Sequence, residues 1–186
     1  MVWLIVVIVV LVVLALAAVW FYNNLVRLRN RVDNAWAQVE VQLKRRWDLI
    51  PNLVETVKGY AAHERETFEA VTNARAAAQQ AQGPAEAAQA EGILSQALGR
   101  LFAVAESYPD LKANQNMMAL QEELTSTENR VSFARQAYND AVTAYNIYKQ
   151  TFPPVVVASM FGHGQDATLL EFEDRAAIAQ PPKVAF

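Results

Sequence analysis

Cysteine is absent from the 186-residue chain, and histidine occurs only twice. The absence of cysteine excludes a disulfide framework, cysteine-bound zinc, an iron–sulfur cluster, a cysteine nucleophile and a lipid anchor attached to cysteine. Two histidines leave little material for metal binding or general-base catalysis. We therefore expect no cofactor, no catalytic residue and no metal-binding residue, and we interpret the chain as a protein that is not an enzyme.

The chain also lacks an excess of positive charge, because it contains 16 Lys and Arg but 19 Asp and Glu. Affinity for nucleic acid depends on basic side chains that neutralise phosphates, so we expect no nucleic-acid partner. The six glycines are dispersed and form no phosphate-binding loop. Strand signals are nearly absent, apart from the short run 155–157.

Two short patterns resemble metal sites but lack essential ligands. His63–Glu64 begins like a metalloprotease motif, yet the second histidine would stand at position 67, which is Thr. A di-metal site in a helical bundle needs Glu-x-x-His pairs on two helices. Neither histidine supplies such a pair for the nearby glutamates, which are Glu122, Glu123 and Glu128. We interpret these carboxylates as a solvated helix face.

Residues 1–22 contain no charged side chain. A helix rises about 1.5 Å per residue, so this segment is long enough to cross the roughly 30 Å hydrocarbon core of a bilayer. Aromatic residues suited to the membrane interface stand near its ends, at Trp3, Trp20, Phe21 and Tyr22. The segment predicts a transmembrane anchor. A cleaved signal peptide, with 15–17 (Ala-Leu-Ala) as cleavage site, is disfavoured because basic residues are absent before a long apolar core.

Basic residues predict the orientation of this anchor. Arg27, Arg29 and Arg31 follow it closely and complete the predicted membrane interface. Residues 23–46 carry six basic and two acidic side chains, whereas 47–186 carry ten basic and seventeen acidic ones. The positive-inside rule then places the N-terminus outside and the remainder in the cytoplasm. We predict a single-pass plasma-membrane protein with the lipid bilayer as one partner.

The rest of the chain has helical periodicity. Small or apolar residues recur at steps of three and four from Ala113 to Tyr148, which predicts one long helix. A second seam runs from Leu94 to Tyr108 and ends before Pro109, because a residue preceding proline disfavours the α conformation. Gly83–Pro84 marks a turn between helices. The predicted fold is all-α.

Pro51 leaves two interpretations of the first half. In the favoured one, Asp48 caps a new helix after a turn, and Pro51 stands in its first turn. This gives helices over 24–46, 49–81, 85–107 and 111–151, which form an antiparallel up-and-down bundle over residues 23–151. The alternative is a single long helix kinked at Pro51.

The segment 152–186 is predicted to be an apolar tail that becomes irregular. With a turn at Pro51, the last helix returns toward the membrane, and the tail meets the bilayer or a neighbouring subunit. With a single kinked helix, the same tail points away from the membrane. Past Gly162 the chain lacks sustained periodicity, which indicates extended or disordered structure. The triplet 44–46 has no evident packing role. The predicted partner surface therefore comprises Lys44, Arg45, Arg46, Phe152, Val155, Val157, Met160 and Phe161.

Three segments together resemble the bacterial LemA family. They are the apolar N-terminal span, the run AWAQVEVQLKRRWDLIPNLVETVKGYAAHE over 35–64, and the run AVAESYPDLKANQNMMALQEELTSTENRVSFARQAYNDAVTAYN over 103–146. The resemblance extends over about residues 1–162 and weakens in the tail. It implies a single-pass membrane protein with a cytoplasmic-side bundle of four helices, and it supports the turn near Pro51. It implies no catalytic residues, because the family has no established enzymatic activity.

These observations lead to two functional hypotheses. The first is a non-enzymatic, membrane-anchored helical scaffold at the inner face of the plasma membrane, which self-associates into a homo-oligomer. The alternative is a regulatory adaptor that binds another membrane protein, such as a protease or a sensor.

Overall fold

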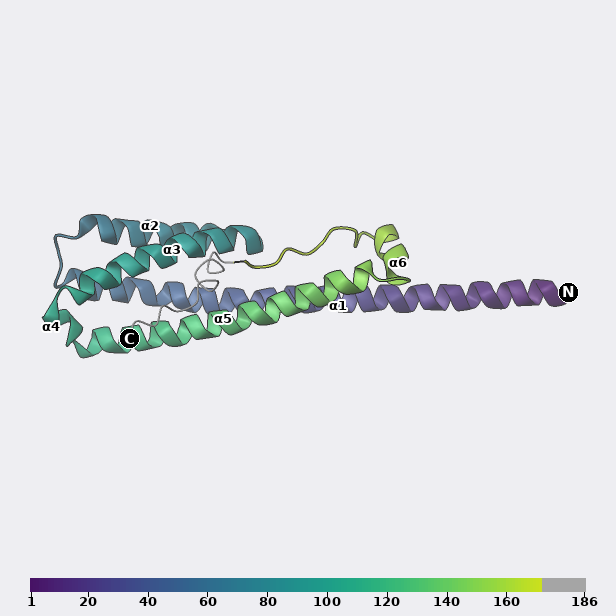
Figure 1. Ribbon diagram of the computed structural model, residues 1–186, viewed down its shortest axis with the longest axis horizontal. Helices are drawn as coiled ribbons and strands as arrows, with labels where there is room; N and C mark the ends of the chain where they lie inside the picture. The colour runs from purple at the N-terminus through teal and green to yellow at the C-terminus, as the bar shows by residue number, and fades with distance from the viewer. Residues whose placement is uncertain (172–186) are drawn as a thin grey trace, which may run out of the picture. The chain divides into compact units, whose positions relative to one another are not determined.

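The computed structural model describes residues 1–171, and all regular structure in that range is helical (Figure 1). The all-α prediction is confirmed. The 155–157 run, which carried the strand signal, lies in a helix that begins at a proline, a residue favoured in a first helical turn. The helices are α1 (Val2–Lys58), α2 (Arg65–Gln80), α3 (Gly83–Glu106), α4 (Pro109–Lys112), α5 (Gln115–Gln150) and α6 (Pro154–Met160).

Helix α1 is continuous over 57 residues and contains Pro51. The predicted turn at Asp48–Pro51 is therefore wrong, and Asp48 lies within the helix instead of capping one. The buried stripe continues past the proline at helical spacing through Ile50, Leu53 and Val57. The chain turns at residues 59–64 instead, so the helix predicted over 49–81 is split between the end of α1 and α2.

Helix α3 agrees closely with its predicted range, whereas the single helix predicted over 111–151 is interrupted at residues 113–114. Helix α3 corresponds to the predicted 85–107, while α4 and α5 together correspond to 111–151. Asn114 separates α4 from α5, and its Oδ1 accepts hydrogen bonds from the backbone N–H groups of Asn116 (2.8 Å) and Met117 (3.3 Å). These bonds satisfy two N–H groups at the start of α5 that have no partner within the helix.

The N-terminal part of α1 is apolar and exposed. Its most apolar 18-residue window has a mean hydropathy of 3.5, and none of that window is buried. Among residues 1–171, α1 is the one helix long and apolar enough to cross a membrane. This segment therefore suggests a membrane anchor or a signal sequence.

The chain divides into two compact units. Among the described residues, the first unit consists of Met1–Gln38 and Gln136–Leu169, and the second consists of Val39–Arg135 and residues 170–171.

The core of the second unit is built by several helices, and α2 packs beside α3 (Figure 1). Small residues such as Ala74, Ala78 and Ala90 are buried in it and allow close helix packing. The larger core side chains are Ile50, Leu53, Val57, Phe68, Val71, Leu94, Leu98, Leu101, Leu111, Met117 and Leu124.

In the first unit, apolar residues of α1 and α5 form the interior. Leu25, Val32, Tyr138, Val142 and Tyr145 are buried there. The buried stripe that the sequence predicts for the long helix thus extends as far as Tyr145. The ring of Trp36 contacts that of Tyr138 edge-on, with centroids 5.6 Å apart, a favourable aromatic arrangement.

The segment after α6 is extended and bonded to α5. The Tyr138 hydroxyl donates to the backbone carbonyl of Thr168 (2.7 Å), and the Asn146 amide pairs with both backbone groups of Ala167 (2.9 Å each). The prediction for the chain past Gly162 is extended or disordered structure. Up to Thr168 the chain is extended, and side chains of α5 hold it in place. The remainder of that prediction, for residues 172–186, lies outside the described residues.

Candidate functional site

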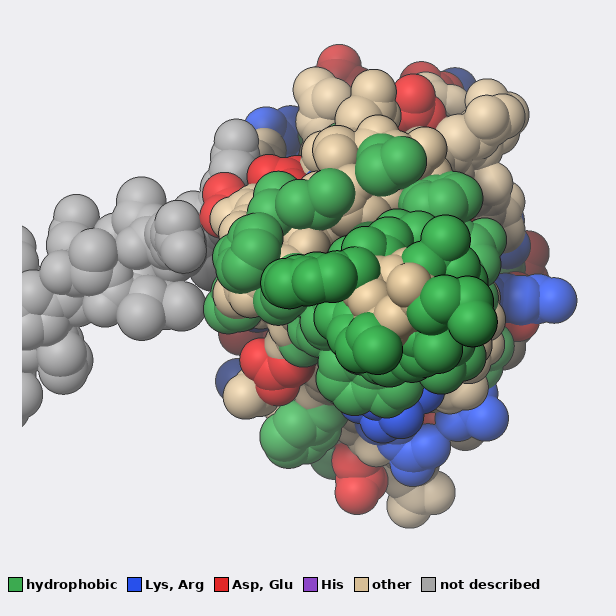
Figure 2. Space-filling model, turned by 90° about the vertical axis from the view of Figure 1, so that its right-hand side faces the viewer, with side chains coloured by type: hydrophobic (Ala, Val, Ile, Leu, Met, Phe, Trp, Pro, Cys, Tyr) green, Lys and Arg blue, Asp and Glu red, His purple; other side chains and the backbone are tan. Residues whose placement is uncertain are grey.

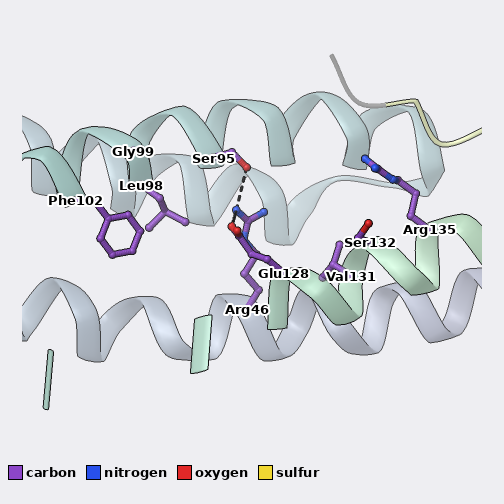
Figure 3. A pocket seen from close by; sticks show the side chains of 9 residues that line it. All are labelled: Arg46, Ser95, Leu98, Gly99, Phe102, Glu128, Val131, Ser132 and Arg135. Atoms are coloured by element: carbon purple, nitrogen blue, oxygen red, sulfur yellow. Dashed lines mark hydrogen bonds and ion pairs between the residues drawn. The ribbon is translucent and has the colours of Figure 1, made fainter. Parts of the chain in front are cut away.

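Arg46 is the centre of a buried polar network in the second unit (Figure 3). The residue is 5% exposed, and its guanidinium donates to Glu91 Oε2 at 2.6 Å and to Glu128 Oε1 at 2.8 Å. It also donates to Ser95 Oγ at 2.9 Å. One side chain therefore connects α1, α3 and α5 through charge-assisted hydrogen bonds.

This network corrects the interpretation of Arg46 as part of a partner surface. Its packing role depends on carboxylates 45 and 82 residues further along the chain, which sequence spacing does not reveal. Lys44 and Arg45 are exposed, and the predicted basic surface is reduced to these two residues.

Glu91 is fully buried and also accepts a hydrogen bond from Trp47 Nε1 at 2.6 Å. Burial raises the pKa of Glu91 above its ordinary value, while the Arg46 guanidinium and the Trp47 N–H oppose that rise. A buried ion pair persists when additional hydrogen bonds compensate for its lost hydration. The three side chains together fix how α1 and α3 pack.

A pocket of about 480 Å³ adjoins this network between α3 and α5 (Figure 3). The two terminal nitrogens of Arg46 already donate to two carboxylates, while its buried Nε has no hydrogen-bond partner in the described part of the chain. Within residues 1–171, no group of three His, Cys, Asp or Glu is placed to hold a metal ion. The pocket is lined by Arg46, Ser95, Leu98, Gly99, Phe102, Glu128, Val131, Ser132 and Arg135.

A second polar contact explains why α1 continues through Pro51. Proline has no N–H, so the carbonyl of Trp47, four residues earlier, lacks its helical donor. Nε of Arg75 on α2 donates to this carbonyl at 2.8 Å. The missing backbone hydrogen bond is thus replaced by a side chain, and α2 is bonded to α1 at the proline.

We expect Arg75→Met to lower the free energy of unfolding by about 1–3 kcal/mol, because the Trp47 carbonyl would lose its donor. In a Pro51→Ala background the same change should cost much less, since the backbone N–H of the introduced alanine restores the helical bond. Denaturant unfolding followed by far-ultraviolet circular dichroism measures both. Arg65→Met, at the exposed start of α2, is the matched control. Equal costs in the two backgrounds would contradict this account.

His163 is the centre of a polar cluster in the first unit. It is buried, and its Nδ1 lies 2.8 Å from the Tyr145 hydroxyl. Lys149 Nζ donates to the backbone carbonyls of His163 (3.2 Å) and Gly164 (3.1 Å) and pairs with Asp166 at 2.8 Å. The weakly patterned tail gave no sign of this burial. The cluster fastens the segment after α6 to α5.

Burial and neighbouring charges shift the pKa values of several side chains in this cluster. Burial, followed by the Arg29 and Lys149 charges, lowers the pKa of His163 below 6.5. Burial also raises the pKa of Tyr145, with Asp33 and Asp166 adding to the rise and Arg29 opposing it. The hydrogen bond from Lys149 is the main cause that lowers the pKa of Asp166.

We expect the packing of this segment to weaken on acidification from about pH 7. Below pH 6.5 the unpacked His163 gains a proton that the packed ring resists, so packing loses stability until the lowered pKa is passed. The protection factor of the Ala167 amide, which donates to Asn146, reports this change. His163→Asn should flatten its pH dependence, whereas His63→Asn, at an exposed site, should not. An unchanged slope in His163→Asn would refute the assignment.

Most of the residues predicted for the tail surface are exposed in the structure, but one of them is buried. Phe152, Met160 and Phe161 are 82%, 72% and 57% exposed, and Val155 is 39% exposed. Val157 is buried and faces the packed side of α6, so its assignment to a partner surface is corrected. At the predicted membrane interface, the exposed residues are Trp3, Trp20, Tyr22, Arg27, Arg29 and Arg31, while Phe21 is half-buried.

The family comparison adds an independent observation to this geometry. Residues 35–186 match the family model described as LemA. The chain belongs to the LemA family. The match includes Arg46, Pro51, Arg75 and Glu91, so the structural contacts described above lie inside the LemA region. It reaches the end of the chain, beyond the limit of about residue 162 expected from the sequence, and excludes the apolar span.

Several curated proteins resemble this LemA-family chain. Magnetosome protein MamQ 2 of Paramagnetospirillum magneticum is 28% identical over 158 residues, which cover 71% of this chain and 58% of the relative. Protein LemA of Metamycoplasma hominis is 27% identical over 134 residues, covering 70% and 60%. Magnetosome protein MamQ of Magnetospirillum gryphiswaldense is 25% identical over 167 residues, covering 76% and 61%. The chain thus spans about three fifths of the length of these relatives.

Proposed function

We propose that this LemA-family chain is a non-enzymatic, membrane-anchored helical scaffold at the inner face of the plasma membrane, where it self-associates. The observation that carries the proposal is the continuity of α1. One helix contains the exposed apolar span and also supplies Ile50, Leu53 and Val57 to a helical core. The same helix would thereby join the segment inserted in the bilayer to the folded helical core.

The basic residues after the span support the cytoplasmic placement. Arg27, Arg29 and Arg31 are all exposed on α1. Basic side chains that closely follow a membrane span are retained on the cytoplasmic side. Near an anionic leaflet each contributes about 1 kcal/mol of attraction.

Two observations support a scaffold. First, the buried charged side chains of Arg46, Glu91 and Lys149 are all engaged in bonds that fasten helices or the tail, as structural groups are. Second, Phe133 on α5 is 73% exposed, and a large aromatic side chain on the surface is characteristic of protein interfaces. We place one self-association contact at Phe133.

Single-cysteine crosslinking in native membranes tests this function, because the chain has no cysteine of its own. Asn129→Cys lies one helical turn from Phe133, so a short bifunctional maleimide should produce an adduct of two identical chains. Glu69→Cys on α2 is the exposed control and should give far less. Adding Phe133→Glu should abolish the Asn129→Cys adduct. A single abundant adduct with a foreign protein would instead favour the adaptor hypothesis.

A further inference from the structure

The segment around α6 has an unusual surface for a short exposed helix. Residues 151–162 contain no charged side chain. Pro154, Val157 and Ala158 are buried on one side of α6. On its other side and at its ends, Phe152, Val156, Met160 and Phe161 are more than half exposed. The helix is therefore apolar on its packed side and on its outer side.

The position of this surface beside α1 indicates what covers it. The Phe161 ring lies 5.4 Å from that of Tyr22, centroid to centroid, and the His163 ring lies 6.1 Å from Tyr22. Tyr22 is the last aromatic residue of the apolar span, and the charge-free sequence continues to Val26, directly before Arg27, the first basic residue. The residues that directly follow α6 thus lie close to the level where α1 passes from apolar to basic sequence.

The space-filling view shows hydrophobic side chains gathered over much of the face that it draws (Figure 2). In the sequence, Arg27, Arg29 and Arg31 follow the apolar span closely. Apolar side chains beside basic ones are the combination that binds the boundary between acyl chains and anionic headgroups. The exposed apolar surface of α6 is continuous with that of the α1 span through the Tyr22–Phe161 contact.

We propose that α6, with Phe152, Met160 and Phe161, inserts into the cytoplasmic interface of the phospholipid bilayer beside the α1 span. The inference rests on the proposed membrane anchoring of α1. It gives the chain a second, in-plane membrane contact. Aromatic and apolar residues at this depth fill the region that Trp and Tyr favour.

The His163 cluster holds α6 in this position. The backbone N–H of His163 donates to the Ala158 carbonyl at 3.0 Å, which ends the helix. Lys149 and Tyr145 then fasten the following residues to α5. The apolar helix is thereby constrained from both ends, because Pro154 follows α5 by only four residues. Its ordering precedes membrane contact and is not a cost of insertion.

Depth-dependent fluorescence quenching tests the proposal with the full-length chain. Met160→Cys is labelled with an environment-sensitive fluorophore and reconstituted in vesicles of equal parts phosphatidylcholine and phosphatidylglycerol. Quenchers attached to the lipid acyl chains and aqueous iodide are then compared. Leu14→Cys in the apolar span and Met118→Cys, half-exposed on α5, are the controls.

The Met160 label should show blue-shifted emission and several-fold stronger lipid quenching than the Met118 label. Quenching by iodide equal to that of Met118 would overturn the insertion. Protection from both quenchers, increasing with the protein-to-lipid ratio, would assign the surface to a second copy of the chain and likewise overturn it. If Leu14 also escapes lipid quenching, the anchor proposal fails and this inference falls with it; if only Met160 escapes, the anchor stands and the inference alone fails.

Discussion

Replacing Glu91 with leucine is expected to lower the free energy of unfolding by about 3–5 kcal/mol. The change leaves the Arg46 guanidinium inside the second unit without its 2.6 Å carboxylate partner and removes the acceptor of the Trp47 N–H. Loss of one member of a buried pair is severe because the other charge keeps its desolvation penalty. Arg46 would retain only the half-exposed Glu128 as a carboxylate partner. Denaturant unfolding of the full-length protein in mild detergent measures the cost.

Two further variants make this expectation specific. The double variant Arg46→Met/Glu91→Leu should recover much of the lost stability, since apolar side chains of similar size can replace a buried ion pair. Glu128→Gln, whose parent side chain is 52% exposed, should cost about 1 kcal/mol or less. A cost for Glu91→Leu no greater than that of Glu128→Gln would show that the network does not stabilise the fold.

Introducing arginine at Leu11 and Leu14 is expected to release the protein from membranes. Each arginine near the centre of a membrane span opposes insertion by about 2.5–3.5 kcal/mol. Two of them should move most of the chain from the membrane fraction to the soluble fraction after alkaline extraction. The wild-type chain should remain in the membrane fraction.

Val41→Arg is the matched control, because it adds the same side chain at an exposed position of α1 beyond the span. It should leave membrane retention unchanged. Intact mass spectrometry of the wild-type protein separates an anchor from a signal sequence. A mature chain lacking residues 1–17 would show cleavage after the Ala-Leu-Ala run and would contradict anchoring by this segment.

The sequence was sufficient to predict helices wherever periodicity and helix boundaries agreed. The regular spacing after Ala113 predicted most of α5, and the predicted seam reached the buried Tyr138 and Tyr145. Gly83–Pro84 and Pro109 similarly marked the starts of α3 and α4, because local backbone preferences decide such positions.

Pro51 was misinterpreted because its effect is decided by a residue on another helix. Local rules favour a turn there, since a proline inside a helix removes one backbone bond and costs about 3 kcal/mol. Arg75, 28 residues beyond Trp47, supplies the missing donor. The resemblance to the LemA family supported the same wrong turn, because it indicated the number of helices but not where the first one ends.

Arg46 and His163 were missed for a related reason. A basic triplet and a histidine between glycines both resemble surface sequence, and their burial depends on partners brought together only by folding. Glu91 lies in an Ala- and Gln-rich stretch. The only indication of its burial in the sequence is its helical spacing from Leu94 and Leu98. Long-range pairing of this kind is invisible to periodicity.

The measurement that tests the central proposal most directly is the mass of the full-length protein in native lipid discs. A membrane-anchored scaffold that self-associates should give a discrete assembly several times the mass of one chain. Phe133→Glu should reduce that mass while leaving the protein in the discs. A single chain per disc over the whole range of protein concentrations would contradict self-association.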